Sequence, residues 1–190
     1  MRRLLWTACG VLVLMTLTAK FRDQLPAGWR GVAGAVGLPV GLVRMGLREA
    51  DRELRVPVSG VLAAQVTDTW GAPRGGGRRH EGQDIFARRG TKVYSATEGY
   101  VVRVGENTLG GKTVFVHGPG GRWYYYAHLE DYAPGLRVGD YVTPDTLLGY
   151  VGDTGNAKGT PPHLHFGVYT SSGAINPHPL LTDRDKAVSK

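Results

Sequence analysis

The chain has 190 residues, enough for one domain of ordinary size with extra segments at its ends, and its 29 glycines disfavour a long helical bundle. The net charge of +7 favours acidic partners, but no basic run alternates with aromatic residues, so we expect no nucleic-acid partner. The single cysteine, Cys9, excludes an internal disulfide and a cysteine zinc site, so any metal must be held by histidine and carboxylate.

The N-terminal sequence is typical of an export signal. Residues 1–19 consist of Met-Arg-Arg followed by an apolar run over 4–19. This pattern predicts either a cleaved signal peptide or an uncleaved inner-membrane anchor, because the run is slightly short for a spanning helix and Leu17 is large for a cleavage site after Ala19. Either reading places the rest of the chain in the periplasm or outside the cell.

Residues 20–55 are expected to form a linker that contains a short amphipathic helix. The stretch over 28–41 is rich in Gly, Ala and Val, which is typical of a loosely packed segment. Helical spacing then predicts a helix just before the domain, with its apolar positions at Val43, Leu47, Ala50 and Leu54.

The residue pattern changes at Val56, where short apolar segments begin to alternate with turn glycines. This alternation predicts an all-β domain over 56–181, with antiparallel sheets packed as a compact sandwich or an open barrel. The charged residues 182–190 are expected to form a disordered tail. The expected strands cover 92–96, 100–104, 113–117, 122–128, 136–142, 147–151 and 164–169.

Two short strings carry candidate metal ligands, His80-Glu-Gly-Gln-Asp84 and His163-Leu-His165. Alternate side chains of a strand share one face, so His80 and Asp84 would point the same way, with Gly82 leaving room between them. His163 and His165 would share a face of a second strand. Imidazoles and a carboxylate around an open position are typical of a catalytic zinc site. The other face of the second strand would meet the core through Leu164, Phe166 and Val168.

A third candidate is His128, at the end of the aromatic segment Tyr124-Tyr-Tyr-Ala-His128. In a regular strand Tyr124, Tyr126 and His128 share one face, which we interpret as the wall of a polar substrate groove. His117 is expected to be structural or solvent-facing and His178 to lie at the surface, so neither receives a role.

Several other chemistries lack their motif. The sequence has no His-Glu-x-x-His string and no Gly-x-Ser-x-Gly elbow. Gly110-Gly-Lys-Thr113 is similar to the end of a phosphate-binding loop, but Glu106 stands where that loop needs glycine.

The motifs together resemble the lysostaphin-like (LytM-type) zinc endopeptidases of bacterial cell walls. The resemblance spans roughly 56–181 and is carried by motifs in the order that the family has them. These are Arg79-His-Glu-Gly-Gln-Asp84, Gly90-Thr-Lys-Val-Tyr-Ser-Ala96, Tyr126-Ala-His128, Val138-Gly-Asp-Tyr-Val142, Gly152-Asp-Thr-Gly155 and Pro162-His-Leu-His-Phe166.

The resemblance implies a compact β fold with a central groove and a Zn²⁺ ion held by His80, Asp84 and His165. It also implies that His128 and His163 are the catalytic groups. Spacing alone could not decide which of His163 and His165 binds the metal and which is catalytic. The implied substrates are peptides of peptidoglycan. One departure is Thr160-Pro-Pro162 before the His-Leu-His string, where the family often has a small or polar residue before the single proline.

Two readings of function remain open. The first is a zinc-dependent endopeptidase that hydrolyses peptidoglycan stem peptides or crosslinks, for which Arg78 and Arg79 are candidates to steer anionic wall peptides. The alternative is a non-catalytic envelope protein that binds the cell wall and activates a partner amidase. Because every ligand position of the family is kept, we favour catalysis.

Overall fold

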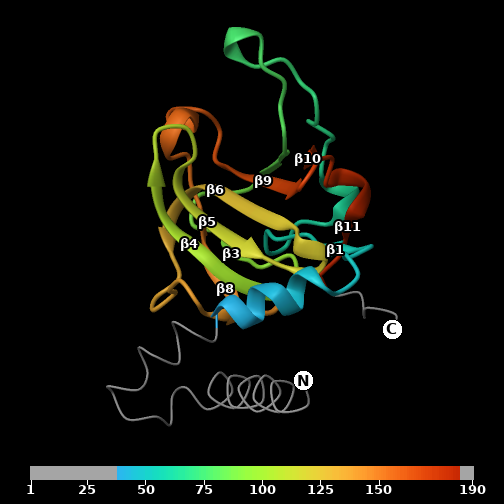
Figure 1. Cartoon of the computed structure of the whole chain (residues 1–190). Coiled ribbons are helices and arrows are strands. Elements are labelled where there is room, and N and C mark those ends of the chain that lie inside the picture. Colours follow the sequence, from blue (N-terminus) through green and yellow to red (C-terminus); the bar gives the residue numbers. More distant parts are fainter. Residues whose placement is uncertain (1–37, 185–190) are drawn as a thin grey trace, which may run out of the picture.

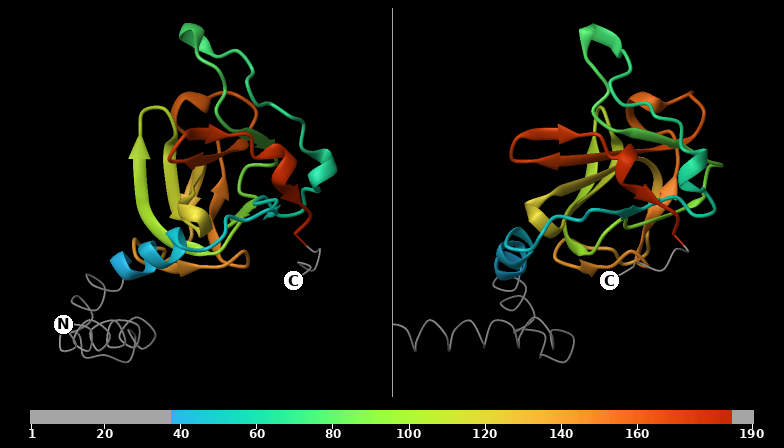
Figure 2. Two further views of the ribbon diagram at one scale, coloured as in Figure 1. Left: turned by 45° about the vertical axis from the view of Figure 1, so that its right-hand side comes forward. Right: turned by 90° about the vertical axis from the view of Figure 1, so that its right-hand side faces the viewer.

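The computed structural model describes residues 38–184. Within this range the chain forms a large antiparallel sheet and a small two-stranded one. The large sheet has the order β10-β9-β6-β5-β4-β7, with β2 paired to β9 and with β8 paired to both β6 and β3. It curls around the core, as the two views of Figure 2 show. The all-β antiparallel fold predicted from the sequence is therefore confirmed.

The strands largely occupy the segments expected. One exception is the segment predicted over 136–142, of which only the last two residues form a strand because turns precede them. The strands of the large sheet are β2 (Gln83–Phe86), β3 (Lys92–Tyr94), β4 (Gly99–Asn107), β5 (Gly111–His117), β6 (Trp123–Tyr132), β7 (Tyr141–Val142), β8 (Leu147–Val151), β9 (His163–Thr170) and β10 (Gly173–Ile175).

The core lies on the concave side of the curled sheet and follows the two-residue period of the strands. On β9, Leu164, Phe166 and Val168 are completely buried, as their alternation predicted. On β6, Tyr124 and Tyr126 are also completely buried in the same core. The opposite faces of these two strands are thereby left for the site described below.

The two ends of the described chain are joined by a short parallel pair, β1 (Leu54–Arg55) with β11 (Leu181–Thr182). The predicted end of the helix and the predicted start of the C-terminal tail both differ from those in the structure. Residues 38–46 are helical, and Leu54 lies buried in β1 rather than in the predicted helix. Helical spacing misplaced it because a single buried residue of a strand satisfies the same pattern. Thr182 likewise belongs to β11 rather than to a disordered tail.

The helix over 38–46 lies at the end of the domain away from the loop that carries the 3₁₀ turn η3 (Gly75–Gly77), which projects from the body in Figures 1 and 2. Within residues 38–184, no helix has both the length and the apolar character that crossing a bilayer requires. The predicted export segment and most of the linker, residues 1–37, lie outside the described residues.

Candidate metal centre

Two adjacent antiparallel strands bring the histidine strings together. In the register of β2 with β9, Asp84 lies opposite His165 and Phe86 lies opposite His163. Directly opposed residues on one face have closely spaced side chains. The pairing of two distant segments therefore places the Asp84 carboxylate beside the His165 ring.

His80 reaches the same point from outside the sheet. It precedes β2, and its backbone N–H donates to the carbonyl of Ala72 at 2.9 Å. The prediction of one continuous strand through His80 is therefore wrong, although His80 and Asp84 do face the same way. Gly82 lies against His165, since a Cβ at position 82 would come within 2.5 Å of the His165 Cε1 atom. Position 82 therefore requires glycine because the His165 ring packs against it, whereas the sequence suggested that the glycine leaves room between His80 and Asp84.

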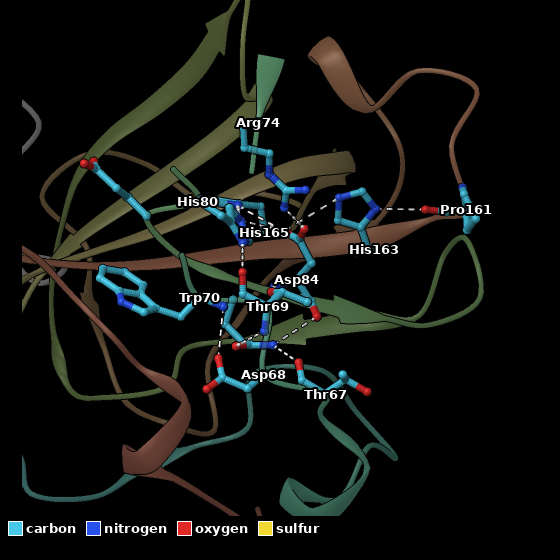
Figure 3. A network of polar contacts seen from close by, with 12 residues as sticks. Thr67, Asp68, Thr69, Trp70, Arg74, His80, Asp84, Pro161, His163 and His165 are labelled. Atoms are coloured by element: carbon cyan, nitrogen blue, oxygen red, sulfur yellow. Dashed lines mark hydrogen bonds and ion pairs between the residues drawn. The ribbon is translucent and has the colours of Figure 1, made fainter. Parts of the chain in front are cut away.

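Three potential ligand atoms converge at this point (Figure 3). Asp84 Oδ1 lies 3.1 Å from His80 Nε2 and 3.1 Å from His165 Nδ1, and the two ring nitrogens lie 2.9 Å apart. Ligands of a tetrahedral zinc at about 2.0–2.1 Å lie roughly 3.3 Å from one another. The two imidazoles and the carboxylate therefore fit a zinc ion in both donor type and spacing.

The surrounding loop orients these side chains. His80 Nδ1 donates to the Thr69 carbonyl at 2.8 Å, which leaves the lone pair of Nε2 directed at Asp84. The Asp84 N–H donates to the Thr69 hydroxyl oxygen at 2.9 Å, and the Arg74 guanidinium contacts Asp84 Oδ2 at 2.5 Å. Thr69 and Arg74 were not predicted from the sequence, because no spacing rule links a loop residue to a ligand ten or more positions away.

His128 reaches the site through a β-bulge. The register of β5 with β6 shifts between Tyr126 and Leu129, and His128 adopts a positive φ of 62°. A bulge changes the face on which the following side chain lies. The predicted shared face of Tyr124, Tyr126 and His128 is therefore wrong: the tyrosines enter the core, while His128 turns to the other side.

His128 and His163 lie side by side, with ring centroids 5.0 Å apart. Each Nδ1 donates at 2.8 Å to a backbone carbonyl, that of Thr154 for His128 and that of Pro161 for His163. Because a carbonyl only accepts, each Nε2 retains a lone pair. His163 Nε2 lies 3.9 Å from Asp84 Oδ1, which places this lone pair beside the candidate metal position.

The protonation states of Asp84, His128 and His165 suit a site that binds metal and accepts protons. Burial by itself would raise the pKa of Asp84, but the adjacent His165 and His80 rings hold the pKa well below its usual value. Burial lowers the pKa of His128 to about 4 and also lowers the pKa of His165. Asp84 is therefore a carboxylate and both imidazoles are neutral near pH 7, which are the forms that bind metal and accept protons.

The profile of peptidase family M23 matches residues 78–177, a span that includes all five of these side chains. This chain belongs to peptidase family M23. The resemblance to lysostaphin-like endopeptidases noted in the sequence is thereby confirmed.

Similar proteins include the L-Ala–D-Glu endopeptidase of Bacillus subtilis, with 41% identity over 124 residues that cover 60% of this chain and 38% of the relative. Helicobacter pylori Csd3 has 32% identity and a TM-score of 0.58 over 74% of this chain and 37% of that chain. The catalytic domain of lysostaphin from Staphylococcus simulans has 31% identity and a TM-score of 0.55 over 62% of this chain and 92% of that domain. The chain thus spans well under half the length of the first two.

The M23 site opens into a cleft of about 790 Å³. Its tyrosines are Tyr125 and Tyr169 rather than the predicted Tyr124 and Tyr126. The ring of Tyr125 meets His165 edge-on at 5.8 Å between centroids. Exposed Phe86 also lines the cleft. The cleft therefore offers apolar and aromatic surface on both sides of the candidate metal centre.

The remaining two histidines, His117 and His178, lie away from the cleft. His117 packs edge-on against Trp123 and contacts the Leu42 carbonyl through Nε2 at 3.3 Å. His178 contacts the Val66 carbonyl at 2.8 Å through Nε2, and it is partly buried rather than a surface side chain. Both anchor neighbouring segments and neither reaches the cleft.

Proposed function

We propose that this M23 protein is a zinc-dependent endopeptidase that hydrolyses peptide bonds in the stem peptides or crosslinks of peptidoglycan. The observation that carries the proposal is the convergence of His80 Nε2, Asp84 Oδ1 and His165 Nδ1 in an open cleft. Two further imidazoles, His128 and His163, face the same point with their Nε2 lone pairs. Such a constellation has the ligands and the proton acceptors that metal-assisted hydrolysis requires.

The names of the relatives support the substrate class. One of them is an L-Ala–D-Glu endopeptidase, and another is the antimicrobial peptidase lysostaphin. We infer that the present chain also acts on cell-wall peptides. An envelope substrate requires an exported protein, so we further propose that residues 1–19 direct or anchor the chain at the inner membrane.

His80, Asp84 and His165 would hold the zinc ion. When bound, zinc supplies a Lewis acid that polarises a carbonyl and lowers the pKa of water to about 7. One of His163 and His128, as the neutral ring, accepts a proton from the attacking water through Nε2. The other would donate to the oxyanion that develops on the scissile carbonyl only with a proton on its own Nε2, because its Nδ1–H already donates to a backbone carbonyl. The carbonyls of Pro161 and Thr154 keep both rings oriented for these steps.

The test is to incubate the purified full-length chain with purified peptidoglycan and to identify the released fragments by mass spectrometry. The proposal requires new peptide termini that disappear on zinc chelation and return on zinc addition. It also requires that a His163→Ala variant, matched for folding, release these fragments about a hundredfold more slowly or slower still. A well-folded, zinc-loaded protein that releases nothing but stimulates an amidase would instead establish the activator alternative.

A further inference from the structure

The charged residues that line the cleft are unevenly distributed. Three arginines of the projecting loop, Arg74, Arg78 and Arg79, line the cleft, and Arg74 contacts Asp84; we name them the arginine wall. Glu81 is the one acid beside Asp84 that lines this cleft of the described chain. Other residues that line the cleft are uncharged, among them Asn107, Leu109, Asn156, Ala157, Thr160 and Pro161.

The loop holds the arginine wall in place. The backbone N–H of Arg74 donates to the carbonyl of Arg78 at 2.9 Å across the three-glycine turn, so these two residues are neighbours. Arg78 Nε donates to the Gly75 carbonyl at 3.2 Å, and Arg79 Nη1 donates to the Gly71 carbonyl at 3.1 Å. Each guanidinium is tethered through one nitrogen, and the others remain available.

Among the described residues, Arg74 is the one member of the arginine wall with an acidic partner. Across residues 38–184, neither Arg78 nor Arg79 forms an ion pair. Arg74 pairs through Nη2 with Asp84, and 40% of its side chain remains exposed. A guanidinium offers its donors in a planar fork that matches the two oxygens of a carboxylate. The arginine wall therefore offers free guanidinium donors to an anion that enters the cleft beside the candidate metal centre.

We propose that the arginine wall binds a free carboxylate on the substrate peptide next to the scissile bond. This inference rests on the proposed function and narrows it. The chain would select stem peptides that carry an unamidated carboxylate, and would discriminate against the same peptides when that group is an amide. An all-glycine peptide, which has no side-chain carboxylate, would gain nothing from the arginine wall.

The experiment compares two synthetic stem peptides that differ only in a carboxylate or carboxamide on the D-glutamyl residue, each made non-cleavable by N-methylation of the scissile amide. Dissociation constants are measured by calorimetry for the full-length protein, for the double variant Arg78→Gln/Arg79→Gln and for Arg137→Gln. Arg137 is exposed and lies outside the cleft, so its variant removes one positive charge elsewhere on the surface, half the change made by the double variant. Cleavage of the two unmethylated peptides is followed in parallel.

A hydrogen-bonded charge pair lost from the complex is expected to weaken binding of the carboxylate peptide by about tenfold or more. Binding of the amide should change less than about twofold, and Arg137→Gln should change neither. Equal losses for both peptides, or no binding of either, would overturn the inference. Cleavage of both peptides at equal rates would overturn the role of the arginine wall and leave the proposed endopeptidase function intact. Arginine-dependent binding without cleavage would support the arginine wall and overturn the proposed endopeptidase function.

Discussion

The contact between Gly82 and His165 provides a sharp test of the candidate metal centre. In a Gly82→Ala variant the added Cβ would lie 2.5 Å from Cε1 and 2.6 Å from Nε2 of His165, and 3.0 Å from the Phe166 carbonyl oxygen. Ordinary contacts of this kind are about 3.5–4.0 Å, so the ring must move by roughly 1 Å. Metal–ligand distances tolerate only about 0.2 Å, so His165 would no longer lie at a ligand position.

We expect Gly82→Ala to lower zinc affinity by at least about tenfold and to lower the free energy of unfolding by about 1–3 kcal/mol. Zinc affinity is measured by competition with a chromophoric chelator, and stability by denaturant unfolding of the metal-free protein. Gly105→Ala on β4 is the matched control, because a Cβ there meets no atom within 4 Å. A Gly82→Ala protein that binds zinc as tightly as the wild type would refute the assignment of His165.

Three further outcomes follow from the contacts described. His163→Ala and His128→Ala should retain zinc but lose about a hundredfold or more in turnover, whereas Asp84→Ala should lose zinc; metal content and fragment release distinguish the two classes. Burial lowers the pKa of His117 below its ordinary value of 6.5, so the unfolded chain binds more protons there and stability falls as pH drops below about 6.5. His117→Gln should lose less stability than the wild type between pH 7 and pH 5, and an identical pH profile would contradict this account. Leu164→Ala should cost about 2–5 kcal/mol in denaturant unfolding because Leu164 is completely buried, and a smaller cost would mean that the core repacks.

Alternation along single strands was the part of the structure that sequence could predict. The string at 163–165 required two polar residues on one face and apolar residues on the other, and β9 has this arrangement. The sequence singled out Gly82 for a different reason from the one that the structure gives: the expected role was to leave room between His80 and Asp84, but a Cβ there would meet the His165 ring. Features that repeat every two residues leave a direct trace in the sequence.

Features that depend on a break in the period left no such trace. The bulge in β6 moves His128 to the face opposite Tyr126, and a regular strand predicts the reverse. The loop that brings Thr69 and Arg74 to Asp84 is set by tertiary contacts rather than by local pattern. Leu54 shows the same limit, because its burial comes from pairing with Leu181 at the far end of the chain.

The bulge at His128 depends on glycines that the sequence marks only as a turn. A Cβ at Gly110 would lie less than 2.5 Å from the Tyr125 hydroxyl oxygen, and one at Gly111 would come equally close to Thr154. This close approach brings the Gly110 carbonyl to the N–H of His128 at 2.8 Å and the Thr154 carbonyl to its Nδ1 at 2.8 Å. A non-glycine residue at positive φ is uncommon, and these two hydrogen bonds hold it there. The turn between β4 and β5 therefore positions His128, and the site requires Gly110 and Gly111 as well as the imidazole.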